Sequence, residues 1–239
     1  MPNLSAWTTR ICIALLLAGL VPTADASTIA IIGTGNVAKA LGPEFAAQGH
    51  TIVYGSRSPG RDDVQALVKQ SGAGAAAVPP SAAAAAAEIV VLAVPGMAVA
   101  DIVRSLGPLE GKVVIDPTNP LTRDQAGRFS LGISGTSNAE IIQDLVPQAH
   151  VVKAFNTLSW REMIDPAASG GPISVPIAGN NAQANAAVAD LIAGMDLEPI
   201  DVGPLDNAHY LEGLLILWIN NRYSDRDSFE IHFRKVSTD

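Results

Sequence analysis

The chain has 239 residues, of which 48% are hydrophobic and only 16% are charged, so it holds enough apolar material for a sizeable buried core. Its formal net charge is -8. This excess of acidic groups argues against nucleic acid as a partner, because binding to a phosphate backbone needs clustered lysine and arginine.

Residues 1–26 have the pattern of a secretory signal peptide. Residues 1–10 carry one positive charge, residues 11–21 are an unbroken apolar run, and small residues at 24–26 form an A-x-A-like cleavage site. The apolar run is shorter than the roughly 20 residues that span a bilayer, so no stable membrane span is expected in the mature chain. We therefore expect residues 27–239 to be an exported, periplasmic protein. If the start site is assigned too far upstream, the protein is cytoplasmic instead.

Apolar strand-like runs alternate with helical stretches along residues 27–239. Short β-branched runs predict buried strands, and apolar residues three or four apart predict helices. Strands are expected at residues 28–32, 51–54, 88–94, 112–115, 150–153, 173–178 and 198–202, and helices at 36–48, 61–70, 98–106, 139–145, 182–193 and 206–219. This alternation indicates βαβ units, so we predict a single α/β domain of Rossmann type with a doubly wound, mostly parallel sheet.

Two segments have an unusual composition. Residues 72–87 are mostly alanine with a Pro-Pro pair, and we favour a short helix capped by Ser81 over a flexible linker, because alanine has the highest helix propensity. Residues 227–236 alternate Phe229, Ile231 and Phe233, which predicts an additional strand.

The segment Gly33–Ala38 matches the dinucleotide-binding fingerprint G-x-G-x-x-[GA], after an expected strand and at the start of an expected helix. Gly33 permits a tight turn, Gly35 lets the backbone approach a pyrophosphate, and Ala38 allows the helix to pack closely on the strand. The pyrophosphate is expected at the helix N-terminus, where backbone N–H groups point outward. The residues assigned to this contact are Gly33, Thr34, Gly35, Asn36 and Val37.

The end of the second strand predicts which dinucleotide binds. NAD-binding folds place Asp or Glu about 20 residues after the fingerprint, for the ribose 2′-hydroxyl. Here the strand is followed by Ser56 and Arg57, and the first acid is Asp62. Ser56 can donate a hydrogen bond, Arg57 can pair with a phosphate, and Arg61 adds a second positive charge. The pattern therefore predicts NADP(H), whose 2′-phosphate these residues would bind.

Other chemistries lack a signal. The four histidines are dispersed, and no cysteine cluster or H-x-x-x-H motif suggests a metal site. The serines of residues 130–137 do not form the G-x-S-x-G turn of serine hydrolases.

Six ordered motifs resemble the family of F420-dependent NADP oxidoreductases and cover nearly all of residues 27–239. They are Gly33–Val37, Gly55–Arg57, Leu92–Pro95, Thr118–Pro120, Val152–Thr157 and Asp201–Leu205. The same domain type is similar to the NADPH-binding part of six-transmembrane metalloreductases and to the N-terminal domain of pyrroline-5-carboxylate reductase.

The resemblance implies hydride transfer between NADP(H) and a deazaflavin, coenzyme F420, or a flavin such as FMN or FAD. The cofactors carry this chemistry, so no catalytic side chain is assigned. The resemblance also places three residues beside the nicotinamide, where a flat acceptor ring could stack: Ala154, Phe155 and Asn156. It places backbone groups of three others around the ribose and nicotinamide: Val94, Pro95 and Asn119.

A homodimer is expected.

Two alternatives to the hydride-transfer function stay open. One is an exported nucleotide-binding or scaffold domain without turnover, and the other is an NADPH-dependent reductase that reduces metal chelates through a flavin.

Overall fold

The structure is a computed structural model, and it describes residues 26–170, 172–223, 229 and 231–236. Its strands are β1 (Thr28–Ile32), β2 (Thr51–Gly55), β3 (Ala76–Val78), β4 (Ile89–Val91), β5 (Val113–Asp116), β6 (Leu121–Arg123), β7 (Phe129–Leu131), β8 (His150–Lys153), β9 (Ser174–Gly179) and β10 (Glu198–Asp201). Its helices are α1 (Asn36–Ala47), α2 (Asp62–Gln70), α3 (Pro80–Ala86), α4 (Val99–Ser105), α5 (Asn138–Leu145), α6 (Trp160–Ile164), α7 (Ala182–Ala193) and α8 (Ala208–Arg222).

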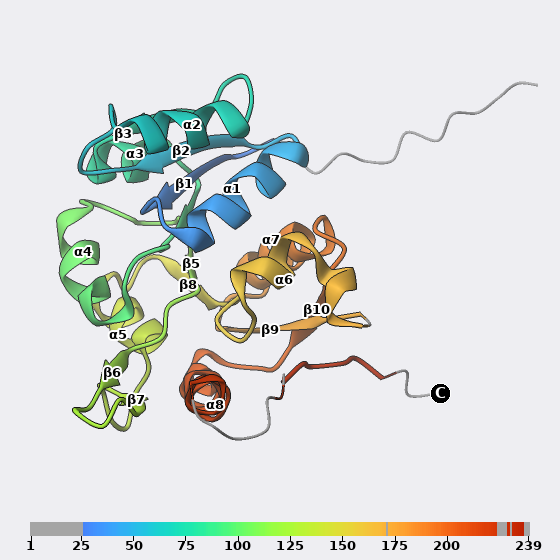
Figure 1. The fold of residues 1–239 in the computed structure, drawn as a ribbon. Helices are drawn as coiled ribbons and strands as arrows, with labels where there is room; N and C mark the ends of the chain where they lie inside the picture. The colour runs from blue at the N-terminus through green and yellow to red at the C-terminus, as the bar shows by residue number, and fades with distance from the viewer. Residues whose placement is uncertain (1–25, 171, 224–228, 230, 237–239) are drawn as a thin grey trace, which may run out of the picture.

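One eight-stranded sheet runs through the molecule in the order β10-β9-β8-β5-β4-β1-β2-β3, as Figure 1 shows. Six neighbouring strands of this sheet are mutually parallel, namely β3, β2, β1, β4, β5 and β8. Strand β9 pairs with β8 in the antiparallel sense. The order β3-β2-β1-β4-β5-β8 is that of the doubly wound dinucleotide-binding sheet. The predicted Rossmann-type fold with a mostly parallel sheet is therefore confirmed.

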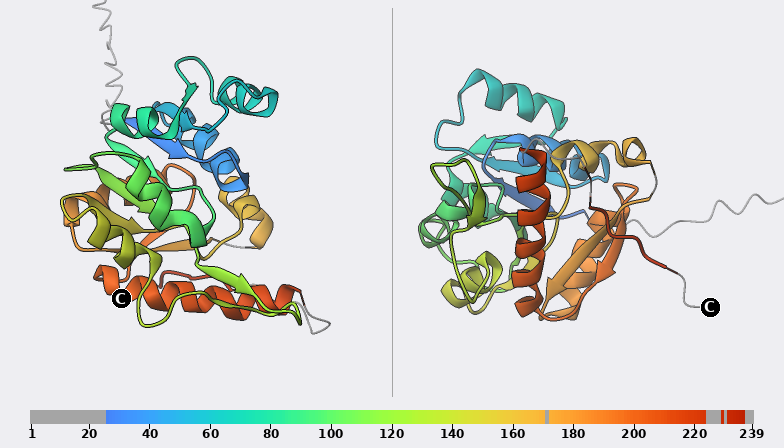
Figure 2. Two further views of the ribbon diagram at one scale, coloured as in Figure 1. Left: turned by 90° about the vertical axis from the view of Figure 1, so that its left-hand side faces the viewer. Right: turned by 60° about the horizontal axis from the view of Figure 1, so that its bottom comes forward.

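Helices cover both faces of the sheet, which explains why most residues of its central strands are apolar (Figures 1 and 2). Successive residues of a strand point to opposite faces. Ile29 and Ile31 of β1 lie in the core cluster that includes residues of α1, α6 and α7. Ala30 and Ile32 lie in the cluster that includes residues of α3, α4 and α5.

The alanine-rich segment contains the expected helix, but its start differs from the prediction. The assignment of Ser81 as the cap is wrong, because α3 begins at Pro80 and Pro79 occupies the N-cap position. Proline suits the first helical position because its missing N–H has no partner there. The short strand β3, the two-stranded ribbon β6-β7 and the helix α6 were not predicted.

The expected C-terminal strand is reduced to one bridge in the described residues. Phe233 pairs with Ser174 in the antiparallel sense, and the Ser174 amide donates to the Phe233 carbonyl at 2.9 Å. Positions 227, 228 and 230 of that prediction, and residues 1–25 of the predicted signal peptide, lie outside the described residues. Within the described part of the chain, none of the helices combines the length and apolar character needed to cross a membrane.

Candidate active site

The turn from β1 to α1 presents two glycines with different roles. Gly33 has φ +112, and an added Cβ would lie 2.1 Å from the carbonyl oxygen of Ala93, so the turn packs directly on the end of β4. Gly35 precedes α1 as its N-cap, and an added Cβ there would meet no atom of the described residues within 4 Å. The backbone at the start of α1 is therefore open on the side where a phosphate would approach. Ala38, the third fingerprint position, is fully buried.

A cleft of about 760 Å³ opens beside these glycines, at the carboxyl ends of β1, β2 and β4. A smaller hollow of about 250 Å³ shares Gly35 and the segment 93–95 with the cleft and extends to Pro117 and Thr118 after β5. The two hollows therefore follow one path across the carboxyl ends of β2, β1, β4 and β5, where open α/β sheets bind ligands. Predicted residues that line this path are Gly33, Thr34, Gly35, Asn36, Val37, Ser56, Arg57, Arg61, Val94 and Pro95.

The two arginines of the cleft differ in their electrostatic environment. Arg61 pairs with Asp63 through two short contacts of 2.7 and 2.8 Å, and its Nη2 lies 3.5 Å from Thr34 Oγ1. This hydrogen-bonded pair raises the pKa of Arg61 and lowers that of Asp63. Arg57 is exposed and makes no ion pair with any residue that the structure describes. A bound phosphate would therefore find an uncompensated guanidinium at Arg57, with Ser56 at the end of β2 beside it.

Asn119 and Asn156 join the ends of β5 and β8 next to the smaller hollow. Asn119 Nδ2 donates to the Asn156 carbonyl at 3.1 Å, and Asn156 Nδ2 donates to Asn119 Oδ1 at 3.0 Å. The Asn119 carbonyl also presses against Gly96, where an added Cβ would lie 2.0 Å away. The loop after β4 and the loop after β5 thus form one packed wall of the site.

The Phe155 side chain is buried in the core, so its ring offers no open surface on which an acceptor could stack. Its side chain is 1% exposed, and its ring lies 6.2 Å from the ring of Phe45 in α1, centroid to centroid. Ala154 is fully buried as well. The reason is local: Phe155 has φ +64, so the chain turns sharply after β8 and the ring packs in the core beneath α1. Of the three residues, Asn156 is the one connected to the cleft wall, through Asn119.

A fully buried ionic network lies behind the smaller hollow, and sequence reasoning missed it. Lys153 Nζ lies 2.9 Å from Asp116 Oδ2 and 2.6 Å from Glu212 Oε1, and all three side chains are fully buried. Burial raises the pKa of Glu212 to about 7, although Lys153 acts in the opposite direction. One cation thus faces two carboxyl groups, and a proton on Glu212 leaves the network without net charge.

Part of this network had a signal in the sequence. Asp116 closes β5 and Lys153 closes β8, each directly after apolar strand residues, and the two are paired in the register of β5 and β8. Opposite charges at the same ends of two neighbouring buried strands predict an ion pair, since a lone buried charge is costly. Glu212 lies 59 residues beyond Lys153 in the apolar helix α8, and nothing in the sequence indicates its partner.

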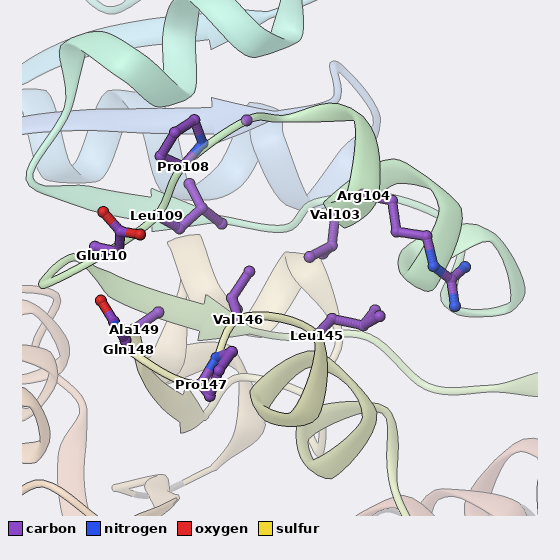
Figure 3. Close-up of a pocket in the computed structure, with 11 residues that line it drawn as sticks. Val103, Arg104, Pro108, Leu109, Glu110, Leu145, Val146, Pro147, Gln148 and Ala149 are labelled. Atoms are coloured by element: carbon purple, nitrogen blue, oxygen red, sulfur yellow. The ribbon is translucent and has the colours of Figure 1, made fainter.

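A further hollow of about 370 Å³ lies between the loops that precede β5 and β8, as Figure 3 shows. It is therefore at the amino-terminal ends of the strands. Its lining is largely aliphatic, and its Arg104 is paired with Asp101 at 2.8 Å. The glycine turn and Arg57 belong to the cleft at the carboxyl ends, which is the candidate site. No cluster of potential metal ligands occurs among residues 26–170, 172–223, 229 and 231–236.

Comparison with known proteins identifies relatives of this chain. The family model described as "NADP oxidoreductase coenzyme F420-dependent" matches residues 28–120. A solved structure from Arthrobacter sp. FB24, provisionally assigned as an F420-dependent NADP reductase, is 32% identical with a TM-score of 0.75, over 81% of this chain and 92% of that one. The hypothetical protein SMa0349 from Sinorhizobium meliloti is 34% identical with a TM-score of 0.65, over 76% and 88% of the two chains.

Curated proteins with a similar sequence include a metalloreductase. STEAP3 of Rattus norvegicus is 28% identical over 191 residues, which is 80% of this chain and 36% of that protein. The chain thus spans about a third of the length of the curated relatives that it matches.

Proposed function

Because this chain belongs to the family of F420-dependent NADP oxidoreductases, we propose that it binds NADP(H) in the cleft and transfers hydride between NADP(H) and coenzyme F420 or a flavin. The two cofactors supply the redox chemistry when bound, with a hydride leaving the nicotinamide and entering the acceptor ring, or the reverse. The role of the protein is to bind and orient the cofactors and to exclude water.

The open backbone at Gly35 is the observation that carries this proposal. A dinucleotide pyrophosphate needs backbone N–H groups without side chains in front of them, at the positive end of a helix dipole. Gly35 provides this opening at the start of α1, and the neighbouring cleft is large enough to extend beyond a phosphate.

NADP(H) is favoured over NAD(H) by the side chains at the end of β2. The Arg57 guanidinium can form a charge-assisted pair with a 2′-phosphate, and Ser56 lies beside it in the cleft lining. No carboxylate lines this cleft among the residues that the structure describes, so the ribose hydroxyl contact of NAD-binding folds has no counterpart in its lining.

The remaining wall suits a direct hydride transfer. Apart from Arg57 and Arg61, the described lining of the two hollows consists of uncharged residues, with neither His nor Cys. Val94, Pro95 and Pro117 form an apolar wall that would keep water from the nicotinamide. The proton that a reduced acceptor needs in addition to the hydride would come from solvent.

A titration of the purified protein with NADPH and with NADH tests the cofactor. We expect NADPH to bind at least tenfold more tightly, a difference of about 1.4 kcal/mol. No binding of either dinucleotide would contradict the proposal.

Supply of acceptors then separates the candidate activities. Oxidation of NADPH with F420 or FMN supports the proposed reaction. Oxidation that requires both a flavin and a ferric chelate supports the second candidate, metal-chelate reduction, which the similarity to STEAP3 favours. Binding without turnover with any acceptor would leave a nucleotide-binding or scaffold domain.

We also propose that the protein is exported, on the basis of residues 1–26. Mass spectrometry of the protein from the periplasmic fraction should find an N-terminus at Ser27. An intact N-terminus in a protein confined to the cytoplasm would contradict the export.

A homodimer is proposed from the surface of α8. Tyr210 and Leu217, seven residues apart on one side of this helix, are 73% and 62% exposed. An apolar helix surface of this kind is typical of an interface. Light scattering should give twice the chain mass for the wild type and the single mass for Leu217→Asp.

A further inference from the structure

We propose that Lys153 and Glu212 are positioning residues that hold the nicotinamide side of the cleft in shape through Thr118 and Asn138. The inference rests on the proposed NADP(H) site, and it concerns residues that lie behind the cleft and do not line it.

Thr118 is the point where the network reaches the site. It is 4% exposed and lines the smaller hollow after β5. Its amide donates to Asp116 Oδ1 at 2.9 Å, its carbonyl accepts from Lys153 Nζ at 2.5 Å, and its hydroxyl accepts from Asn138 Nδ2 at 2.7 Å. Every polar group of Thr118 is thus held from behind, so the position of this wall is set by the network.

Asn138 connects the second wall to the same network. Its side-chain amide also donates to the carbonyl of Gly96 at 3.0 Å, in the loop that follows β4. Its backbone amide donates to Glu212 Oε1 at 2.9 Å, and the same oxygen accepts from Lys153. Glu212 of α8 therefore ties together both loops that flank the smaller hollow.

The chemistry of the network favours positioning over stabilisation. Fully buried ions lose their hydration, and apolar replacements of such groups are often neutral or stabilising. What buried charges provide is geometry, because each short hydrogen bond in a medium of low dielectric constant tolerates little displacement. Glu212 Oε2 is buried and has no hydrogen-bond partner among the residues that the structure describes, and a buried unsatisfied group of this kind calls for a reason beyond stability.

The network contacts only one end of the proposed cofactor site. Its hydrogen bonds reach the loops after β4 and β5, whereas Ser56, Arg57 and Arg61 lie at the end of β2 on the other side of β1. A disturbance of the network should therefore affect ligands with a nicotinamide and spare ligands that occupy only the adenosine end.

The test compares NADPH with 2′,5′-ADP, which carries the 2′-phosphate and lacks the nicotinamide. Glu212→Leu keeps the Lys153–Asp116 pair and removes the acceptor shared by Lys153 and Asn138. We expect about tenfold weaker binding of NADPH and an affinity for 2′,5′-ADP within about twofold of the wild type. Glu212→Gln keeps the Oε1 acceptor and should bind both ligands as the wild type does.

Asn138→Ala provides a second test that leaves the ionic groups in place. It removes the side-chain bonds to Thr118 and Gly96 and should give the same selective loss of NADPH affinity, even if Glu212→Leu does not fold. Equal losses for both ligands, or no loss for either, would overturn the positioning role. A wild-type protein that binds 2′,5′-ADP but not NADPH would also overturn it, and one that binds neither would overturn the proposed function and this inference with it.

Discussion

The Cα of Gly33 lies so close to Ala93 that an added Cβ would come within 2.1 Å of the Ala93 carbonyl oxygen. The turn after β1 and the end of β4 are therefore in direct backbone contact, and this contact forms the floor of the cleft. At Gly35, two residues further on, an added Cβ would meet no atom of the part of the chain that the structure describes within 4 Å. The two fingerprint glycines can thus be separated experimentally, one as a packing requirement and the other as a binding requirement.

Gly33→Ala should destabilise the fold. The new methyl group meets a backbone carbonyl that cannot move without shifting β4, and φ +112 is unfavourable for alanine. We expect the free energy of unfolding to fall by about 1–3 kcal/mol, measured by urea denaturation. An unchanged denaturation midpoint would show that the turn can relax and would contradict this packing.

Gly35→Ala should leave stability nearly unchanged and weaken cofactor binding. Its φ of -80 suits alanine, and the methyl group meets no atom of the described residues within 4 Å, so the free energy of unfolding should stay within about 0.5 kcal/mol of the wild type. The same methyl group would occupy the space of the pyrophosphate and weaken NADPH and NADH alike in a binding titration. Wild-type affinity for both dinucleotides in this variant would place the pyrophosphate elsewhere.

Arg57→Ala should weaken binding of NADPH by about 1–3 kcal/mol and leave NADH nearly unchanged, because only NADPH carries the 2′-phosphate. Arg61→Ala should cost less, since the Arg61 guanidinium is already paired with Asp63. Arg128→Ala is the matched control, because Arg128 is an exposed arginine paired with Asp124 and lies outside the cleft lining. Equal losses for NADPH and NADH in Arg57→Ala would refute the 2′-phosphate assignment.

Patterns that depend on neighbouring residues could be read from the sequence. The β-branched strands, the helix that follows Gly35 and the arginine after β2 each follow from local composition and spacing, and the structure has these elements at the expected places. The predicted N-cap of α3 was wrong by two residues, because the helix begins at Pro80, one residue before Ser81. Such errors change an element boundary without changing the fold.

Features that depend on tertiary packing could not be read in this way. The orientation of Phe155 is set by its positive φ and by the space beneath α1, which the motif alone does not reveal. The contact between Lys153 and Glu212 of α8 cannot be predicted from the sequence either, since no spacing rule relates residues 59 positions apart. The resemblance gives the segment that contains Phe155 an expected place beside the nicotinamide, but the burial of the Phe155 ring follows from packing that a motif does not describe.

The protonation of Glu212 should make stability fall as pH rises through the neutral range. Its pKa is about 7 in the folded protein and near its ordinary value of 4.5 in the unfolded chain, so the folded state holds a proton that the unfolded state has released. The associated stability is fully present below about pH 4.5 and is lost as pH rises to about 7. The glutamine of Glu212→Gln stays neutral at every pH and abolishes this effect. Urea denaturation at about pH 5 and about pH 8 should show the wild type losing about 2–3 kcal/mol relative to Glu212→Gln. A parallel pH dependence in the two proteins would mean that Glu212 stays ionised against Lys153 at both values.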